Sequence, residues 1–585
     1  MRKTKIICTL GPATSSDEVV RELMLSGMNV ARFNFSHSTH EEHRKRFEQV
    51  DRLRRELSLP VGILLDTKGP EIRVGLFEKG KVILHKGDRF TLTTRNVPGT
   101  ERCVSVSYKQ LPMDIDDGCR ILIDDGLIEM HVLSHTETDI ECMVDNGGQV
   151  SDRKGVNVPG IRLSMPYISE QDRSDILFGA QMGFDFIAAS FVRCAEDIED
   201  VRAILSTADT KSKSIRIIAK IENAEGVKNI DEILRVADGI MVARGDMGVE
   251  IAFEELPGIQ KKLIQKAYSA GKVVVTATQM LDSMIKNPRP TRAETTDVAN
   301  AIYDGTSAIM LSGETAAGSY PVEALKTMAL IAERAEREID YEKQFRSRVS
   351  TDLPNITNAI SHATVTTATD LKAAAILTVT TTGQTARMIS KYRPQCPIIS
   401  GTPNKQAYHQ LSLSWGVTPM LLEEKHSEDE LFDHAVNCAK NLDLIEDGDL
   451  VCITAGVPLG ISGTTNMMRV HIVGDILITG TGITAQQVHA NLCVCDSEEE
   501  ARLQFKPGEI LVIPKTSNAI LDLIKDCAGI ITEQDGANSH AAIVGLALGK
   551  PVLVGAKGAT EILRTGTNVT LDAERGIVCN MANKT

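Results

Sequence analysis

Eight short apolar runs, each ending in a polar residue or glycine and followed by a helical stretch, constrain this chain more than any other feature. The first three are Lys5–Leu10, Asn29–Phe35 and Val61–Asp66. After a gap the pattern resumes with five more, Phe184–Ser190, Ile215–Ile221, Gly239–Arg244, Lys272–Ala277 and Ala308–Ser312. Nearly continuous apolar strands that alternate with helices are typical of parallel pairing, and eight such units predict a closed (β/α)₈ TIM barrel, an α/β fold.

The distance between runs predicts further domains. It grows to about 120 residues between the third and fourth run, which is too long for a loop. That segment is rich in Val, Ile, Thr and turns such as Asp124-Asp125-Gly126, so a small β-barrel domain is expected at 70–166, inserted into a barrel of residues 1–69 and 167–340. A second α/β unit is expected at 341–473 and a separate unit at 474–585.

Charge and cysteine usage bear on partners and compartment. Lys and Arg number 64 against 78 Asp and Glu, and the net charge of −14 would repel a polyanion, so nucleic acid is not expected as a partner. The 12 cysteines are scattered without a paired framework, which predicts reduced thiols and a cytoplasmic protein. Neither a signal peptide nor an uncharged apolar run of about 18 residues is present, so no membrane segment is expected.

Polar residues gather at the predicted carboxyl ends of the barrel strands, where barrels of this type place their reactive groups. Strand alternation puts Lys220 and Glu222 on one strand face. Glu222 and Asp246 are then two carboxylates at one rim, a set that suits Mg²⁺. The alternative is a pair of salt bridges, Lys220 with Glu222 and Arg244 with Asp246. Because so much buried charge is costly without a ligand, we favour the metal site.

Other rim residues suggest anion and cation sites. Gly245 and Gly248 flank Asp246 where a helix containing residues 253–256 is expected, and amides at a helix start favour an anion, although a tight turn is the more common reason for a lone pair of glycines at this spacing. Arg32 and Arg73 have planar forks that suit phosphate, although each alone is more often in a surface ion pair.

Four oxygen-bearing residues on neighbouring strands suit K⁺, although an ordinary hydrogen-bond network explains them equally well. They are Asn34, Ser36, Asp66 and Thr67. Anion, metal and lysine together fit phosphoryl or enolate chemistry without choosing between them.

Several motifs together resemble the pyruvate kinase family, from Lys3 to about Val473. They are KTKIICTLGP (3–12), GMNVARFNFSH (27–37), DTKGPEIR (66–73), KGVNVPG (154–160), AKIENAEG (219–226), MVARGDMGVE (241–250), TATQMLDSMI (276–285) and MLSGETAAG (310–318). The resemblance implies the same barrel with an inserted β-domain and a C-terminal α/β domain. It also implies phosphoryl transfer from phosphoenolpyruvate to ADP, giving pyruvate and ATP.

The resemblance also implies roles for the rim residues. Glu222 and Asp246 would hold Mg²⁺ or Mn²⁺, while Arg32 and Lys220 would stabilise the migrating phosphoryl group. The amides of Gly245 and Asp246, with Thr278, would hold the substrate carboxylate. Thr278 or Ser312 would help to protonate the enolate through water, and the sequence does not decide between them.

Nucleotide, potassium and effector sites follow from the same resemblance. Arg73 and Lys154 would meet ADP phosphates, with Asn34 and Ser36 beside the nucleotide, and the insert would close as a lid. Glu71 stands where potassium-dependent members carry glutamate, so the four-residue set named above should bind K⁺. The segment Thr380-Thr381-Thr382-Gly383-Gln384-Thr385 resembles the family's sugar-phosphate effector site, although a polar helix start without a ligand is as consistent with its spacing. The family implies a homotetramer.

Residues 474–585 lie outside the common pyruvate kinase plan. The segment Thr532–Gly555 resembles the swivelling phosphohistidine domain of phosphoenolpyruvate-utilising enzymes, with His540 at the carrier position. Asn538 replaces the usual threonine and no nucleotide-grasp domain is present, so we expect His540 to be structural. Two rival functions are a phosphoenolpyruvate synthase-like phosphotransferase, which would need this histidine, and a metabolite sensor without catalysis, which would lack the rim residues.

Overall fold

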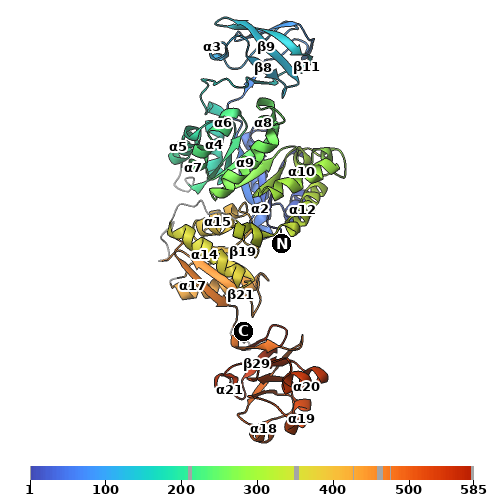
Figure 1. The fold of residues 1–585 in the computed structure, drawn as a ribbon. Coiled ribbons are helices and arrows are strands. Elements are labelled where there is room, and N and C mark those ends of the chain that lie inside the picture. The colour runs from blue at the N-terminus through green and yellow to red at the C-terminus, as the bar shows by residue number, and fades with distance from the viewer. Residues whose placement is uncertain are drawn as a thin grey trace. The chain divides into compact units, whose positions relative to one another are not determined.

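A computed structural model describes residues 2–208, 214–347, 355–425, 427–457, 465–474 and 476–580 (Figure 1). The predicted barrel is confirmed, because eight parallel strands close in the order β1-β17-β16-β15-β14-β13-β3-β2. These strands are β1 (Lys5–Thr9), β2 (Val30–Asn34), β3 (Gly62–Asp66), β13 (Phe186–Ala189), β14 (Arg216–Ile221), β15 (Gly239–Ala243), β16 (Val273–Ala277) and β17 (Ala308–Leu311). The residues of these strands are almost all buried, as expected for parallel strands that are covered on both faces of the sheet.

Capped helices connect the barrel strands. Ser16 caps α1 (Asp17–Leu25), and Thr39 with Glu42 forms a capping box on α2 (His40–Glu56). The other helical segments of the barrel are η1 (Pro12–Thr14), α4 (Glu170–Met182), α5 (Ala195–Thr207), α6 (Ala224–Lys228), α7 (Ile230–Val236), α8 (Arg244–Glu250), α9 (Leu256–Ser269), η3 (Asp282–Ile285), α10 (Arg292–Tyr303), α11 (Gly313–Ala316) and α12 (Pro321–Glu338). Together they surround the strands and bury an apolar core between helix and sheet.

Between β3 and α4 the chain is mainly β-structure, as its composition predicts. It forms a seven-stranded sheet, β4-β12-β8-β9-β10-β6-β7, and a two-stranded sheet, β11-β5, around one apolar core. Its elements are β4 (Ile72–Arg73), β5 (Lys81–Leu84), β6 (Arg89–Thr93), β7 (Cys103–Ser105), α3 (Leu111–Asp114), β8 (Arg120–Ile123), β9 (Ile128–His135), β10 (Asp139–Asn146), β11 (Gly148–Ser151) and β12 (Gly155–Asn157).

The rest of the chain contains two further sheets. The first has the order β20-β19-β18-β21-β22, with α13 (Tyr341–Ser347), α14 (Ile356–Asp370), β18 (Ala375–Val379), α15 (Gln384–Lys391), β19 (Ile398–Thr402), α16 (Lys405–Leu411), β20 (Val417–Leu421), α17 (Glu428–Asn441), β21 (Leu450–Ala455) and β22 (Met467–Ile472). The predicted α/β unit is therefore present.

The second sheet carries the C-terminal segment, in the order β23-β30-β29-β25-β26-β27-β28-β24. Its elements are β23 (Ile476–Thr479), β24 (Thr481–Gly482), β25 (Gln487–Val494), α18 (Glu498–Gln504), β26 (Ile510–Ile513), η4 (Asn518–Ile520), α19 (Leu521–Asp526), β27 (Gly529–Thr532), α20 (His540–Leu548), β28 (Val552–Val554), α21 (Ala559–Ile562), β29 (Asn568–Asp572) and β30 (Ile577–Asn580). All twelve cysteines are free, and among the described helices none has the length and apolar character needed to cross a bilayer.

Candidate active site

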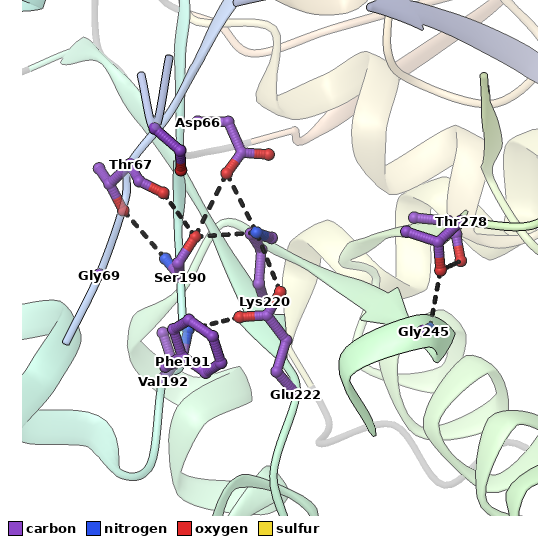
Figure 2. A network of polar contacts seen from close by, with 12 residues as sticks. Asp66, Thr67, Gly69, Ser190, Phe191, Val192, Lys220, Glu222, Gly245 and Thr278 are labelled. Atoms are coloured by element: carbon purple, nitrogen blue, oxygen red, sulfur yellow. Dashed lines mark hydrogen bonds and ion pairs between the residues drawn. The ribbon is translucent and has the colours of Figure 1, made fainter. Parts of the chain in front are cut away.

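Lys220 lies at the centre of a buried polar network at the carboxyl ends of the barrel strands (Figure 2). Its ammonium nitrogen Nζ lies 3.1 Å from Asp66 Oδ1, 2.8 Å from Ser190 Oγ and 2.9 Å from Glu222 Oε1. Burial lowers the pKa of Lys220, but the charges of Asp66 and Glu222 outweigh it and raise this pKa above the ordinary lysine value. The lysine is therefore a fixed positive charge at neutral pH.

Asp66 at the end of β3 holds two cations. Its Oδ2 accepts from Arg32 Nε at 2.6 Å, and its Oδ1 accepts from Lys220. Arg32, from β2, also donates to Thr9 Oγ1 at 3.0 Å and is buried, so it is not in the surface ion pair considered from the sequence. Burial raises the pKa of Asp66, yet the charges of Arg32 and Lys220 hold it below the usual aspartate value. The predicted phosphoryl-binding pair therefore shares one carboxylate.

Glu222 follows β14 and is almost fully buried. Its Oε2 accepts from the backbone amide of Phe191 at 2.7 Å, and its Oε1 accepts no hydrogen bond in the described part of the chain, although it forms the ion pair with Lys220. Burial raises the pKa of Glu222, and the negative charge of Asp246 raises it further. The charge of Lys220 lowers it, and the net result is a pKa of about 7. A buried carboxylate oxygen with spare acceptor capacity beside a second carboxylate fits a hard divalent cation.

The rim around Thr278 corrects part of the sequence prediction. The helix after β15 is α8 and begins at Arg244 itself, whereas residues 253–255 lie between α8 and α9, and Phe253 is 83% exposed. Arg244 pairs with Asp297 at 2.6 Å, so the predicted alternative of an Arg244–Asp246 salt bridge is wrong, whereas its Lys220–Glu222 half is present.

Two of the other predicted rim residues, Thr278 and Ser312, directly follow the barrel strands β16 and β17. The Gly245 amide donates to Thr278 Oγ1 at 2.8 Å (Figure 2). Ser312 follows β17, and its hydroxyl is buried without a hydrogen-bond partner among the described residues. Non-glycine residues at two strand ends have left-handed backbones, with φ of 55° at Phe191, 68° at Thr278 and 52° at Gln279. Such backbone strain is typical of functional sites.

The four predicted potassium ligands form two pairs at the ends of β2 and β3. Asn34 Oδ1 accepts from the Ser36 amide at 3.1 Å, and Thr67 Oγ1 accepts from the Ser190 amide at 3.1 Å. Asn34 and Asp66 are register partners in the barrel, so the two pairs lie on adjacent strands. Hydrogen bonds of the kind considered as the alternative are therefore present at these residues.

The predicted nucleotide residues of the insert engage carboxylates of this chain. Arg73 Nε lies 2.7 Å from Glu71 Oε2, and Lys154 Nζ lies 2.8 Å from Asp124 Oδ1. Both cations are more than a third exposed. A cleft of about 440 Å³ nearby is lined by residues of the insert and of the barrel, among them Glu71, Asp125, Asn157, Phe191 and Asp246. The cleft has room for a ligand between the two parts.

Ser190 is a functional candidate that the sequence analysis left without a role. It follows β13, is 1% exposed, and contacts Lys220, Asp66 and Thr67 (Figure 2). Its position at the end of the fourth predicted strand was the available signal. A lone serine carries no charge or motif, so the sequence did not separate it from a capping residue.

The predicted effector segment, Thr380–Thr385, connects β18 to α15. Gly383 has φ of 78° and precedes the helix, and its amide donates to Thr380 Oγ1 at 3.1 Å. Arg387 donates to the Thr382 carbonyl at 2.9 Å. Burial, with the charge of Arg216, lowers the pKa of Arg387 to about 9, which indicates a cation short of compensating charge.

The predicted carrier position in the C-terminal segment, His540, is the first residue of α20. Its Nδ1 lies 2.9 Å from Thr516 Oγ1 and its Nε2 lies 3.0 Å from Asn518 Oδ1. Both ring nitrogens are therefore engaged.

Comparisons with known proteins agree along the whole chain. Family models match residues 1–325 ("Pyruvate kinase, barrel domain"), 358–471 ("Pyruvate kinase, alpha/beta domain") and 505–576 ("PEP-utilising enzyme, mobile domain"). Pyruvate kinases of Sporosarcina psychrophila and Geobacillus stearothermophilus are 48% and 49% identical, over 99% of this chain and 99% and 98% of theirs. A crystal structure of a pyruvate kinase from Cryptosporidium parvum is 42% identical with a TM-score of 0.77, covering 81% of this chain and 96% of that one.

This similarity decides against both rival functions, because the relatives that match the chain from end to end are pyruvate kinases. Members of this family generally require a divalent metal ion and K⁺, and they act on phosphoenolpyruvate and ADP. Over almost its whole length, the chain belongs to the pyruvate kinase family and is a phosphotransferase that converts phosphoenolpyruvate and ADP to pyruvate and ATP.

Proposed function

We propose that Arg32 and Lys220 carry the phosphoryl transfer of this enzyme. The observation that supports this most is their shared anchor, because Asp66 fixes both cations at the barrel rim at 2.6 and 3.1 Å. Two held cations stabilise negative charge on the migrating group without reorganising during the reaction. Lys220 would also offset the charge of the enolate left behind.

Glu222 and Asp246 are the residues that would hold the divalent ion. Oε1 of Glu222 supports this choice, because among the described residues it accepts no hydrogen bond and has only the ion pair with Lys220, which leaves it able to bind a metal ion. When bound there, the ion supplies positive charge to the carboxylate and enol oxygens of phosphoenolpyruvate. Two carboxylate ligands would leave the other coordination positions of the ion for substrate and water.

The remaining roles concern substrate orientation and the proton. The Gly245 and Asp246 amides, with Thr278, would hold the substrate carboxylate, and the Gly245–Thr278 hydrogen bond keeps these groups together. The hydroxyl of Ser312 supports a part in protonating the enolate, because it has no hydrogen-bond partner among the described residues and can both donate and accept a proton. Thr278 donates to the carbonyl of Ala277, so it would first have to break that bond.

The monovalent site and the nucleotide site complete the proposal. K⁺ would be held by Asn34, Ser36, Asp66 and Thr67. Arg73 and Lys154 would exchange their present carboxylate partners for ADP phosphates, and Asn34 and Ser36 would border the nucleotide. The exposure of both cations supports this exchange, since exposed ion pairs are weak and break at little cost.

Regulation by a phosphorylated metabolite at Thr380–Thr385 is part of the same proposal. Its support is Arg387, a half-buried arginine that donates to neutral oxygens of this segment. A titration of sugar phosphates and nucleotides at low phosphoenolpyruvate concentration tests it, and an unchanged half-saturation with every effector would reject it. The homotetramer and the cytoplasmic location also stay predictions, and light scattering in solution tests the first.

A coupled assay with phosphoenolpyruvate, ADP, Mg²⁺ and K⁺ tests the central assignment. Lys220→Met should lower kcat by at least about 10²-fold, the effect of removing one group that stabilises transition-state charge. Lys261→Met is the matched control, because this lysine pairs with Asp304 on the barrel surface and should leave kcat within about twofold. Equal turnover by wild type and Lys220→Met would reject the assignment.

A further inference from the structure

The peptide group that joins Ser190 to Phe191 bridges two parts of the enzyme. Its carbonyl accepts from Tyr167 Oη at 3.0 Å, and its amide donates to Glu222 Oε2 at 2.7 Å. Tyr167 lies in the segment between β12, the last strand of the insert, and α4, which we call the return linker (residues 158–169). One planar unit therefore connects the return linker to the candidate metal ligand.

The Ser190 side chain extends the connection to Lys220. A hydroxyl has one proton, and the Thr67 carbonyl at 2.7 Å is a closer acceptor than Asp66 Oδ1 at 3.2 Å. When the Ser190 hydroxyl donates its proton to the Thr67 carbonyl in a hydrogen bond, its oxygen can accept a hydrogen bond from the Lys220 ammonium at 2.8 Å. Asp66 Oδ1 accepts a second hydrogen bond from the ammonium and Glu222 Oε1 forms an ion pair with it, so Ser190 adds a third contact that orients Lys220.

The bridging peptide needs external support. Phe191 has φ of 55°, a left-handed conformation that is unfavourable for a bulky residue, so its neighbours must hold it in place. Gly69 packs so closely that an added Cβ would lie 2.8 Å from Ser190 Cβ. On the other side, the Arg193 guanidinium lies 5.7 Å from the Tyr167 ring and donates to the Met165 carbonyl of the return linker at 3.3 Å.

We infer that Ser190 and Tyr167 are positioning residues that couple the return linker of the insert to Lys220 and Glu222. This inference rests on the proposed roles of those two residues. Ser190 orients the ammonium directly, and Tyr167 orients both groups through the 190–191 peptide. Neither touches substrate, and each acts through the residue that does.

A double-mutant cycle with Ser190→Ala and Tyr167→Phe tests the inference, with kcat and KM for phosphoenolpyruvate measured in the coupled assay. Ser190→Ala should lower kcat about tenfold or more, the effect of one lost hydrogen bond to a charged group, with KM changed less than about threefold. Tyr167→Phe should lower kcat about threefold to tenfold. Because both act on one peptide, the double variant should lose clearly less than the product of the two single effects.

Controls separate positioning from folding and from the proposed function. Tyr303→Phe removes a tyrosine hydrogen bond of 2.8 Å to Glu338 on the barrel surface and should leave kcat unchanged. Circular dichroism and thermal unfolding establish that each variant is folded. Folded single variants with kcat within twofold of wild type, or effects that multiply independently, would overturn the inference even if Lys220→Met is inactive. An active Lys220→Met would instead remove the proposed function on which it rests.

Discussion

Asp66→Asn is the most demanding test of how the rim is built. Asp66 offers two carboxylate oxygens to Arg32 and Lys220, whereas asparagine has one oxygen and one NH₂ group. Whichever way the amide turns, one buried cation meets a donor instead of an acceptor. Loss of the partner of a buried charge typically costs about 3–5 kcal/mol.

This free-energy cost should mainly raise the activation free energy, because the two cations would no longer be aligned with the transition state. At 1.36 kcal/mol per factor of ten, even the lower value predicts a fall in kcat/KM of about 10²-fold or more in the coupled assay. Asp238→Asn is the matched control, because Asp238 also lies between two cations, Arg216 at 2.7 Å and Arg202 at 2.9 Å, next to the start of β15. This control should lower the unfolding temperature and leave kcat within about threefold. Folded Asp66→Asn with a tenth or more of wild-type kcat/KM, or an equal loss in the control, would refute the reasoning.

Three further predictions concern K⁺, pH and the C-terminal segment. Replacing KCl by tetramethylammonium chloride should lower kcat at least about tenfold if Asp66 and its neighbours bind K⁺, and equal rates in the two salts would contradict the site. Burial lowers the pKa of His43 to about 4, so the unfolded chain binds a proton below pH 6.5 that the folded chain does not. The contribution of His43 to the free energy of unfolding should be fully present above pH 6.5 and should fall by at most about 3 kcal/mol as pH drops towards 4. In denaturant titrations, His43→Gln should weaken this dependence of the unfolding free energy on pH. An unchanged pH dependence in the variant would show that other groups cause it. Both ring nitrogens of His540 are hydrogen-bonded, so His540→Ala should keep the wild-type kcat. For the same reason, radiolabelled phosphoenolpyruvate should leave no acid-labile label on the wild-type chain. A label on the wild type that is absent from the variant would show that His540 carries phosphate.

The barrel could be predicted from the sequence because each strand is buried on both faces and therefore reads as a short apolar run. Each of the eight predicted barrel runs contains an observed strand. The chain order of the strands also fixed which residues would meet at the rim, since parallel strands end on the same side. That rule places Asp66, Lys220 and Glu222 at one rim, but it does not predict that Asp66 pairs with both Arg32 and Lys220.

Contacts between distant residues could not be predicted in the same way. Arg244 binds Asp297 instead of Asp246, and no local pattern connects residues 53 positions apart. The start of α8 was missed because the chain turns into a helix directly after β15, without a loop that the glycines would mark. Ser190 was missed because its importance comes from three groups that converge on one hydroxyl, and a sequence gives residue types without distances.

The left-handed backbone conformations of Phe191, Thr278 and Gln279 lower the thermal stability of this enzyme while they support its catalytic rate. Each such residue stores about 1–3 kcal/mol that the surrounding barrel must supply. Glycine at these positions would release that energy and slow thermal inactivation, but it would also loosen the peptide beside Glu222 and the loop beside Gly245. Variants selected only for survival at high temperature should therefore accumulate glycines at this rim and lose catalytic rate with them.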